Sequence, residues 1–433
     1  VVVDEAQALK SDESALYRVL SSLKIPFKLL LTGTPLQNNK RELFNLLQFI
    51  DPAMRADQLD ERFSQITSEN LPELHDLIRP YFLRRTKAMV LTFLPPMAQI
   101  IVPVSMSVLQ EKLCKSIMER NPQLIRSVFV QQGGKLKPSE RGSLSNILMQ
   151  LRKCLCHPFI YSQAIEDRNV PPEVMRRNLI EASPKLMLLE IMLPKLKERG
   201  HRVLMFSQFL DQLTILEDFL NGLGLKHERL DGNQSSLEKQ KKIDAFNAPN
   251  SDIFAMLLST RAGGVGINLA TADTVIILDP DWNPHQDIQA LSRAHRIGQR
   301  KKVLCFQLMT VDSVEEKILQ IGRKKLALDH LLIEILDNEE DAPNDVESVL
   351  KHGAAALFGE GKKKEAIMYD SATVERLLDR SMMEETKTGE DKSAESAFAF
   401  ARVWANDEGG LKDDLQVKET SVSVGVWEQI LKQ

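Results

Sequence analysis

The sequence predicts an α/β fold in two units, each built on a mostly parallel sheet. Apolar runs such as VVV (1–3) and VLMF (203–206) are nearly continuous, as in parallel strands that helices cover on both faces. Helical patterns separate these runs, and strands that alternate with helices form parallel sheets. A chain of 433 residues, 43% hydrophobic and 27% charged, is long enough for two or three globular domains.

Four segments follow one another along the chain. Residues 1–104 hold two strands, at 1–4 and 28–34, each followed by a helix. Residues 105–182 are helical in pattern apart from an exposed polar loop at 131–143. Residues 183–336 hold the larger sheet, with strands expected at 202–207, 226–231, 253–260, 274–279 and 303–309. Residues 337–433 form an acidic tail, which we expect to be partly disordered between short helices such as SATVERLLDRS (371–381).

The net charge of −4 hides an asymmetry between the tail and the rest of the chain. Residues 334–420 carry 22 acidic and 11 basic side chains, so the remainder has a net charge of +7. A mildly basic body is compatible with contact to nucleic acid. No run of about 18 apolar residues is present, so we expect no membrane span.

The four cysteines are few and scattered, which favours a reducing compartment over a disulfide scaffold. The stretch CLCH (154–157) resembles half of a metal site, but no second Cys/His pair stands at zinc spacing, and we expect helix packing instead. The chain starts inside an apolar strand at Val1, so we interpret it as a fragment of a longer protein.

Asp4 and Glu5 directly follow the first strand. In phosphoryl-transfer sites an Asp at a strand end helps to hold Mg²⁺, and an adjacent carboxylate can align or deprotonate the attacking water. The alternative is a solvated acidic strand end. The stretch LLLTGTPLQN (29–38) favours the functional interpretation, because it places the hydroxyls of Thr32 and Thr34 beside that acidic end. A simple strand-to-helix turn would also suit Thr, Gly and Pro.

The stretch STRAGGVGINL (259–269) follows a strand and contains three glycines, whose exposed amides could cradle phosphate oxygens. By itself it would be a bare turn. Arg293 and Arg296 are three positions apart, so on a helix they would project from one face. Two guanidiniums aimed at a cleft match the charge that develops on a γ-phosphate, whereas a solvated basic face is the alternative. Trp282 either touches DNA or packs over the sheet edge.

Eight motifs occur in a fixed order across residues 1 to about 335: DEAQ, LTGTPLQN, LRRTK, LRKCLCHP, VLMFSQF, RLDG, STRAGGVGINL and RAHRIGQ. In this order they resemble the Swi/Snf-type chromatin remodelling ATPases of helicase superfamily two. VLKHGAAALFGEG (349–361) and IMYDSATVERLLDRS (367–381) resemble the segment after the motor in chromodomain-helicase remodellers. The resemblance implies two RecA-like lobes, 1–104 (truncated at its N-terminus) and 183–336, with a helical insertion at 105–182 and a tail at 337–433.

The resemblance also implies a role for each motif residue. Asp4 would hold Mg²⁺, Glu5 would activate water, and Arg293 and Arg296 would act as arginine fingers. The remaining ATP-cleft residues would be Gly264, Gly266 and Asn268. Residues coupling the nucleotide state to lobe movement would be Gln7, Thr32 and Thr34. Residues that grip the DNA backbone would be Ser207, Gln208, Ser259 and Thr260, with Trp282 lying against DNA.

Two departures from the family pattern matter. Gln7 stands where most remodellers carry His, and Gln can hydrogen-bond across the lobes but cannot titrate. A phosphate-binding loop of the form G-x-x-x-x-G-K-[ST] occurs nowhere, so we expect this chain alone to hydrolyse no ATP.

The expected whole protein is a nuclear ATP-dependent translocase that acts on double-stranded DNA, nucleosomes and their histones within a multiprotein chromatin complex. Two alternatives remain open. One is a DNA-repair translocase or strand-separating helicase of the same superfamily, which would share the motor motifs. The other is a non-catalytic module that binds DNA or chromatin, which the missing phosphate loop would favour.

Overall fold

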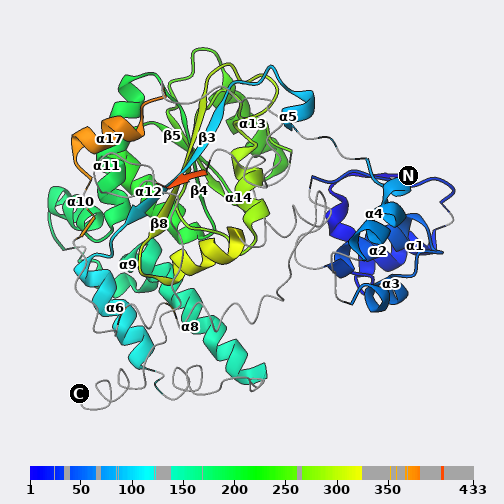
Figure 1. Cartoon of the computed structure of the whole chain (residues 1–433). Helices are drawn as coiled ribbons and strands as arrows, with labels where there is room; N and C mark the ends of the chain where they lie inside the picture. Colours follow the sequence, from blue (N-terminus) through cyan, green and yellow to red (C-terminus); the bar gives the residue numbers. More distant parts are fainter. Residues whose placement is uncertain are drawn as a thin grey trace.

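The computed structural model describes residues 1–23, 25–33, 40–64, 70–83, 85, 87–120, 122, 138–167, 169–260, 266–323, 352, 357, 366–367, 369–380 and 401–403. These residues form a small N-terminal unit and a larger α/β unit (Figure 1). Both contain parallel sheets, which confirms the predicted fold class. No helix in the described ranges is long and apolar enough to cross a membrane.

The N-terminal unit has a two-stranded sheet, in which β1 (Val2–Val3) and β2 (Leu29–Leu30) pair in parallel. Its helices are η1 (Ala6–Leu9), α1 (Ala15–Ser22), α2 (Lys40–Ile50), α3 (Ala56–Arg62), α4 (Leu71–Ile78) and η2 (Arg79–Tyr81). The short helix α5 (Lys87–Val90) follows in the connection to the larger unit (Figure 1). Phe44, Phe49 and Phe63 fill its interior, each at most 1% exposed. The two predicted strands are therefore present but much shorter than their apolar runs.

The larger sheet has seven strands in the order β5-β6-β4-β7-β8-β3-β9, all parallel. The strands are β3 (Met97–Val104), β4 (Val203–Ser207), β5 (His227–Leu230), β6 (Ala255–Ser259), β7 (Thr274–Ile277), β8 (Val303–Thr310) and β9 (Ala401–Val403). All five strands predicted between residues 202 and 309 are confirmed, with slightly different bounds.

Helices cover both faces of this sheet, and the alternation of side chains along β4 shows how. Val203 and Met205 pack with α11 (Pro184–Glu198) and α12 (Leu210–Gly222). Leu204 and Phe206 point the other way and pack with α13 (Ser236–Asn247) and α14 (Pro284–Leu291). Successive strand side chains face opposite sides of a sheet, so a fully apolar strand needs both layers.

The strand β3 lies outside the unit to which the sequence assigned it. Residues 97–104 were expected in the first lobe, but they pair with β8 along their whole length, from Met97 with Val303 to Val104 with Thr310. The boundary between the two units therefore precedes Met97 rather than following residue 104. A continuous apolar run such as MAQIIVPV predicts a buried strand without naming its partner.

The helical segment comprises α6 (Val108–Glu119), α8 (Pro138–Cys156), α9 (Pro158–Tyr161), η3 (Gln163–Ile165) and α10 (Pro172–Glu181). Residues 138–143, expected in a polar loop, instead begin α8, with Pro138 as its first residue; residues 131–137 lie outside the described ranges. The α6–α8 pair shares an apolar cluster with Val314 and Ile318 of the larger unit. The helical segment is thus fastened to the larger unit by a common core.

Part of the predicted tail docks on the larger unit. Val374 and Leu377 of α17 (Ser371–Leu377) join the core that α11 covers, which confirms the helix expected in SATVERLLDRS.

Arg380 donates to the side chain of Asp273 at 3.3 Å and to the hydroxyl of Thr274 at 2.6 Å. His201 and Lys301 also reach the Asp273 carboxylate, at 3.0 and 3.3 Å. Most of 337–433 lies outside the described ranges, so the expected disorder stays a prediction.

A buried ion pair joins three elements of the larger unit. The Lys185 ammonium donates to both carboxylate oxygens of Glu315 at 2.7 and 2.8 Å and to the carbonyl of Leu278 at 2.7 Å. The two side chains are 1% and 0% exposed. A buried charge is tolerated only when its partner and hydrogen bonds are complete. This pair therefore holds α11, the end of β7 and the segment after β8 in one arrangement.

We expect Lys185→Met to lower the free energy of unfolding by about 3 to 5 kcal/mol, because Glu315 then remains as an uncompensated buried charge. Urea unfolding followed by circular dichroism measures the change. The control is Lys185→Met combined with Glu315→Leu, which should be less destabilised than the single variant. A double variant as unstable as the sum of the two single variants would contradict the explanation.

Asp273 predicts a pH dependence of stability. Burial by itself raises the pKa of Asp273, but the hydrogen bond from His201 and the charges of Arg380 and Lys301 outweigh it and hold that pKa below its ordinary value of 3.8. A lowered pKa in the folded state contributes stability that is present at neutral pH and is lost as the pH falls below 3.8 toward the folded pKa. Asp273→Asn should therefore be less stable than the native chain at pH 7, with the difference shrinking in acid titrations of unfolding. A difference that is constant down to pH 3 would argue against this role.

Candidate nucleotide and DNA site

The acidic pair lies at the carboxyl end of β1, where ligands of parallel sheets bind. Glu5 adopts a left-handed backbone conformation, with φ 51° and ψ 48°, and its amide donates to the Asp4 carboxylate at 2.9 Å. This conformation is uncommon for residues other than glycine and clusters at functional sites. Asp4 is exposed and Glu5 half-buried, so both carboxylates can reach a ligand at the sheet edge.

Gln7 connects Glu5 to Thr32 through its side-chain amide. Its Nε2 donates to Glu5 Oε2 at 2.6 Å, and its Oε1 accepts from the Thr32 hydroxyl at 2.7 Å. The structure thus brings three of the predicted residues together, but within the N-terminal unit rather than across the lobes. An amide donates and accepts at every pH, so this bridge does not titrate. Thr34 lies outside the described residues.

Arg293 and Arg296 do not share a helix face, and that expectation is wrong. The helix α14 ends at Leu291, and both arginines lie in the turns that follow it. The carbonyl of Arg293 accepts from the amide of Leu269 at 3.2 Å, and Arg296 Nη1 donates to the carbonyl of Ile267 at 2.8 Å. These two bonds hold the arginine turn against the end of the glycine-rich loop.

That the arginine turn and the acidic strand end form one site stays a prediction, and the charges of the two segments are compatible with it. Burial lowers the pKa of Arg293, the charge of Arg296 lowers it further, and the charge of Glu5 opposes both effects. Arg293 is only 8% exposed, so its guanidinium lies inside the structure rather than in bulk solvent. The residues predicted to meet across the cleft are therefore near enough to interact electrostatically.

The glycine-rich loop is described only in its second half. Gly264 lies outside the described residues, whereas Gly266 has a positive φ of 66° and is exposed. The side-chain oxygen of Asn268 accepts from the amide of Ala270 at 3.2 Å, and its carbonyl accepts from Asn247 Nδ2 at 2.8 Å. Asn268 therefore shapes the loop next to the arginine turn, and contact with nucleotide stays a prediction for these residues.

Three of the four residues expected to grip DNA are buried. Ser207, Ser259 and Thr260 are 0%, 6% and 5% exposed. The Ser207 hydroxyl accepts from the amide of Phe209 at 3.2 Å, and its carbonyl accepts from the amide of Thr260 at 3.0 Å. These contacts occupy Ser207 inside the fold and align two strand ends. Gln208, half-buried, is the one of the four whose side chain reaches the surface.

Trp282 is half-buried and packs against the α6–α8 cluster. The sequence offered packing as one of two roles for Trp282, but it placed that packing over the sheet edge rather than against this cluster. Arg152 of α8 lies beside it and was missed by the sequence analysis. Its Nη2 donates to the carbonyl of Pro280 at 3.0 Å, and its guanidinium lies 5.5 Å from the ring centre of Phe209. The same carbonyl accepts from Gln208 Nε2 at 2.9 Å. The sequence held two signals for Arg152: its place in the motif LRKCLCHP, and a charge on an otherwise apolar helix face.

Two acidic side chains near Trp282, Asp279 and Asp287 of α14, are used within the fold. Asp279 and Asp287 are 2% and 7% exposed. Burial raises the pKa of both, well above the ordinary value for Asp287, where the charges of Asp281 and Asp279 add to the effect. Asp287 also accepts from Gln307 Nε2 at 2.8 Å. Their carboxyl groups are thus structural groups of the interior.

His157 of the CLCH stretch uses both ring nitrogens within the fold. Its Nδ1 accepts from the amide of Phe159 at 3.2 Å, and its Nε2 donates to the carbonyl of Leu179 at 2.9 Å. Burial lowers the pKa of His157 to about 4, so the ring is neutral at neutral pH. The ring therefore fixes the start of α9 rather than offering a nitrogen to a ligand.

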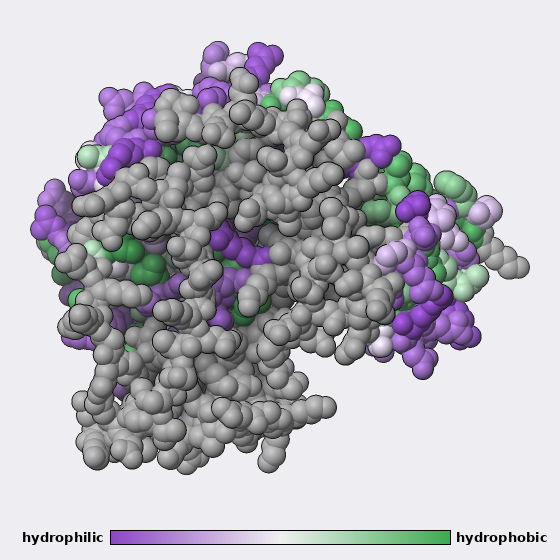
Figure 2. Space-filling model, viewed as in Figure 1, coloured by the Kyte–Doolittle hydropathy of each residue, from purple (hydrophilic) through white to green (hydrophobic). Residues whose placement is uncertain are grey.

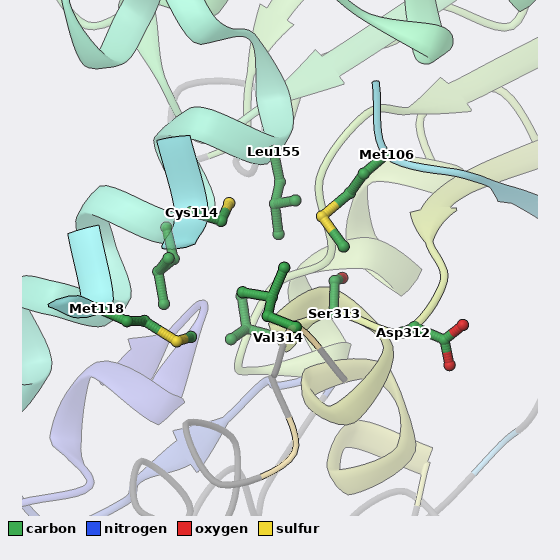
Figure 3. Close-up of a pocket in the computed structure, with 9 residues that line it drawn as sticks. Met106, Cys114, Met118, Leu155, Asp312, Ser313 and Val314 are labelled. Atoms are coloured by element: carbon green, nitrogen blue, oxygen red, sulfur yellow. The ribbon is translucent and has the colours of Figure 1, made fainter. Parts of the chain in front are cut away.

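A small pocket opens between α6, α8 and the turn at 312–314 (Figure 3). Met106, Cys114, Met118 and Leu155 point into it, and the lining is almost wholly apolar. Polyphosphates need donors and positive charge, which this lining lacks. The pocket shares no residue with the acidic pair or the arginine turn, so it is not the candidate nucleotide site.

We expect Arg152→Met to reduce stability by about 1 to 3 kcal/mol, because the Pro280 carbonyl loses one of its two donors. The loop should also loosen around Trp282, shifting tryptophan emission to longer wavelength when Trp404 and Trp427 are replaced by Phe. Lys153→Met is the matched control, since Lys153 is half-exposed and its ion pair with Asp211 spans 3.9 Å. Unchanged Trp282 emission in Arg152→Met would show that Arg152 does not position the loop.

Comparisons with known proteins identify two domains. A family model of the SNF2-related domain matches residues 1–160, and one of the helicase conserved C-terminal domain matches residues 184–298. Chromatin remodeling factor mit1 of Schizosaccharomyces pombe is 52% identical over 438 residues, an alignment that covers 100% of this chain and 31% of that protein.

Two further relatives align with the whole chain. The CHD3-type chromatin-remodeling factor PICKLE of Arabidopsis thaliana is 39% identical over 455 residues, covering 100% of this chain and 32% of PICKLE. The Chromodomain-helicase-DNA-binding protein 3 homolog of Caenorhabditis elegans is 41% identical over 469 residues, covering 100% of this chain and 26% of that protein. The chain thus spans less than a third of the length of these curated relatives.

Proposed function

The chain belongs to the Swi/Snf ATPases of helicase superfamily two, in their chromodomain-helicase branch, and on that premise we propose that it is the C-terminal portion of an ATP-dependent DNA translocase that remodels nucleosomes. The observation that carries the proposal is the acidic strand end in which Gln7 bonds both Glu5 and Thr32, together with an arginine turn that Arg296 fixes against the glycine-rich loop. Carboxylates that face guanidiniums across two α/β units are what hydrolysis of a nucleoside triphosphate requires.

The residues at the strand end fit a magnesium nucleotide. Asp4 is exposed and uses one carboxylate oxygen on the Glu5 amide, which leaves hard oxygen ligands of the kind that Mg²⁺ prefers. A magnesium ion bound there would neutralise phosphate charge. Glu5, held by Gln7, is placed to orient the attacking water and accept its proton. Arg293 and Arg296 would stabilise the negative charge that develops on the transferred phosphoryl group.

The sequence lacks the loop that would hold the β- and γ-phosphates, so we propose that these 433 residues alone do not turn over ATP. One face of the small sheet is exposed, which supports the proposal that a further segment packs over it in the whole protein. Val2, Phe27 and Leu29 are 61%, 69% and 43% exposed, although they lie on or beside parallel strands. Parallel strands are normally covered on both faces, and contiguous exposed apolar surface marks a site of association.

The substrate of the motor is double-stranded DNA on nucleosomes, held through its phosphate backbone and therefore without sequence preference. Gln208, after β4, and Arg152 both donate to the carbonyl of Pro280, two positions before Trp282, and Gln208 and Trp282 are the partly exposed members of the predicted DNA set. Histones, a multiprotein chromatin complex and a nuclear location follow from the family. A module that binds DNA without hydrolysis is the second candidate, favoured by the missing phosphate loop.

The test is DNA-stimulated ATP hydrolysis by protein made from the complete coding sequence and by residues 1–433 alone. We expect activity only in the first, and we expect Arg296→Ala to lower its kcat by about a thousandfold or more, because an arginine finger contributes that much. Arg300→Ala is the matched control, since Arg300 is exposed in the same segment.

Nucleosome sliding and strand displacement then separate remodelling from helicase activity. Sliding without strand displacement supports the proposal, and strand displacement without sliding would replace it with a helicase. ATP hydrolysis that survives Arg296→Ala would exclude the proposed catalytic site.

A further inference from the structure

The motif LRRTK (83–87) contributes no residue to the acidic strand end or to the arginine turn. Its last residue, Lys87, opens α5 in the connection between the two units. The Lys87 ammonium donates to the carbonyl of His295 at 2.7 Å, although the two residues are 208 positions apart. His295 lies between Arg293 and Arg296, so Lys87 reaches into the arginine turn from outside the larger unit.

Three cations therefore gather at one place. The pKa of Lys87 is lowered by burial first, then by the charges of Arg296 and Arg293. The charge of Glu5 acts in the opposite direction on Arg293. Like charges held together cost free energy, and a bound anion relieves that cost. Positive charges gathered in this way favour the binding of a polyanion.

The carbonyl that Lys87 contacts is itself fixed. His295 Nε2 donates to the carbonyl of Pro95 at 2.9 Å, and burial lowers the pKa of the ring, so this histidine is neutral at pH 7 and adds no fourth charge. An ammonium group has three N–H donors, and the His295 carbonyl takes one of them. Lys87 keeps solvent access although the surrounding protein lowers its pKa, so its remaining donors can meet a ligand.

We propose that Lys87 is a third phosphate-binding cation of the nucleotide site, which the connection between the units supplies and which binds the polyphosphate of the nucleotide together with Arg293 and Arg296. This inference rests on the proposed function and extends it. The two N–H donors that the His295 carbonyl leaves free can bind phosphate oxygens in charge-assisted hydrogen bonds while the bond to that carbonyl is kept. Nucleotide binding would thereby fasten the connection to the arginine turn and fix the distance between the two units.

A purely structural tie between Lys87 and His295 is the competing explanation, and three substitutions separate the two. Lys87→Gln keeps an N–H donor for the carbonyl but removes the charge. Lys87→Met removes both, and Lys87→Arg keeps the charge. Lys112→Met, on the exposed face of α6, controls for the loss of one surface charge.

The experiment measures kcat and KM for ATP at saturating DNA, using protein made from the complete coding sequence. Lys87→Met and Lys87→Gln should both raise the KM about 10- to 100-fold, the effect of losing a hydrogen bond to a charged group. Lys87→Arg should restore most of the affinity, and Lys112→Met should change nothing. Affinity for inorganic tripolyphosphate, measured by calorimetry, should fall in the same order, which ties the effect to phosphate rather than to the base.

Two results would overturn the inference: Lys87→Gln behaving like the native protein while Lys87→Met is impaired, or all three variants keeping the native KM. Arg296→Ala is run alongside. If Arg296→Ala loses activity while Lys87→Met keeps the native KM, only the proposed role of Lys87 is refuted. Full activity of Arg296→Ala would refute the proposed function itself.

Discussion

Parallel strands bring their carboxyl ends to one edge of a sheet, and the seven-stranded sheet of this chain places Ser207, Ser259 and Asp279 near that edge. The hydrogen bonds among them follow from this arrangement. Asp279 accepts from the amide of Gln208 at 3.1 Å, and the amide of Thr260 donates to Ser207 at 3.0 Å. The edge is therefore an internally bonded platform, and the loops that leave it carry the partly exposed side chains.

Polar groups inside the structure determine how the peripheral elements attach to this platform. Lys185 and Glu315 hold α11 against the segment after β8, and Arg152 fastens α8 to the loop that carries Trp282. Asp273 collects Arg380, Lys301 and His201 from three different parts of the chain. Each of these groups would cost several kcal/mol if left without its partner, so each admits one arrangement of the elements that it joins. In the view of Figure 2, the surface of the described residues is a mixture of polar and apolar side chains.

The sequence predicted the parts of the fold that depend on local pattern. The strands from β4 to β8 were located because buried parallel strands are continuous apolar runs with helices between them. The strand β3 was not predicted: MAQIIVPV lies in a stretch that was expected to be largely helical, and its apolar pattern does not reveal that it pairs with β8. The pattern also overextended α14, because the turn that ends this helix depends on tertiary bonds from Leu269 and Ile267 rather than on a helix-breaking residue.

The candidate site was predicted by motif order, and its internal contacts were not. The order predicted Glu5 as a catalytic residue and Gln7 and Thr32 as coupling residues, but only the structure shows that the Gln7 amide bonds to both of the others. Arg152 and Lys87 were missed as functional residues because each acts on a backbone carbonyl distant in sequence, at Pro280 and His295. Every residue carries a backbone carbonyl, so the sequence does not show which carbonyl a side chain will contact.

The pairing of β3 with β8 has a consequence for synthesis on the ribosome. Gln99 and Gln307 face each other across this pair and are 208 positions apart in the chain. At about 5 to 20 residues per second, β3 emerges some ten seconds or more before the strand that it needs. During that interval an apolar strand with two unpaired edges is exposed, which is the kind of segment that chaperones bind and that pairs with other chains when it is left unprotected. The larger unit thus depends on protection of its earliest strand until its last long strand has been made.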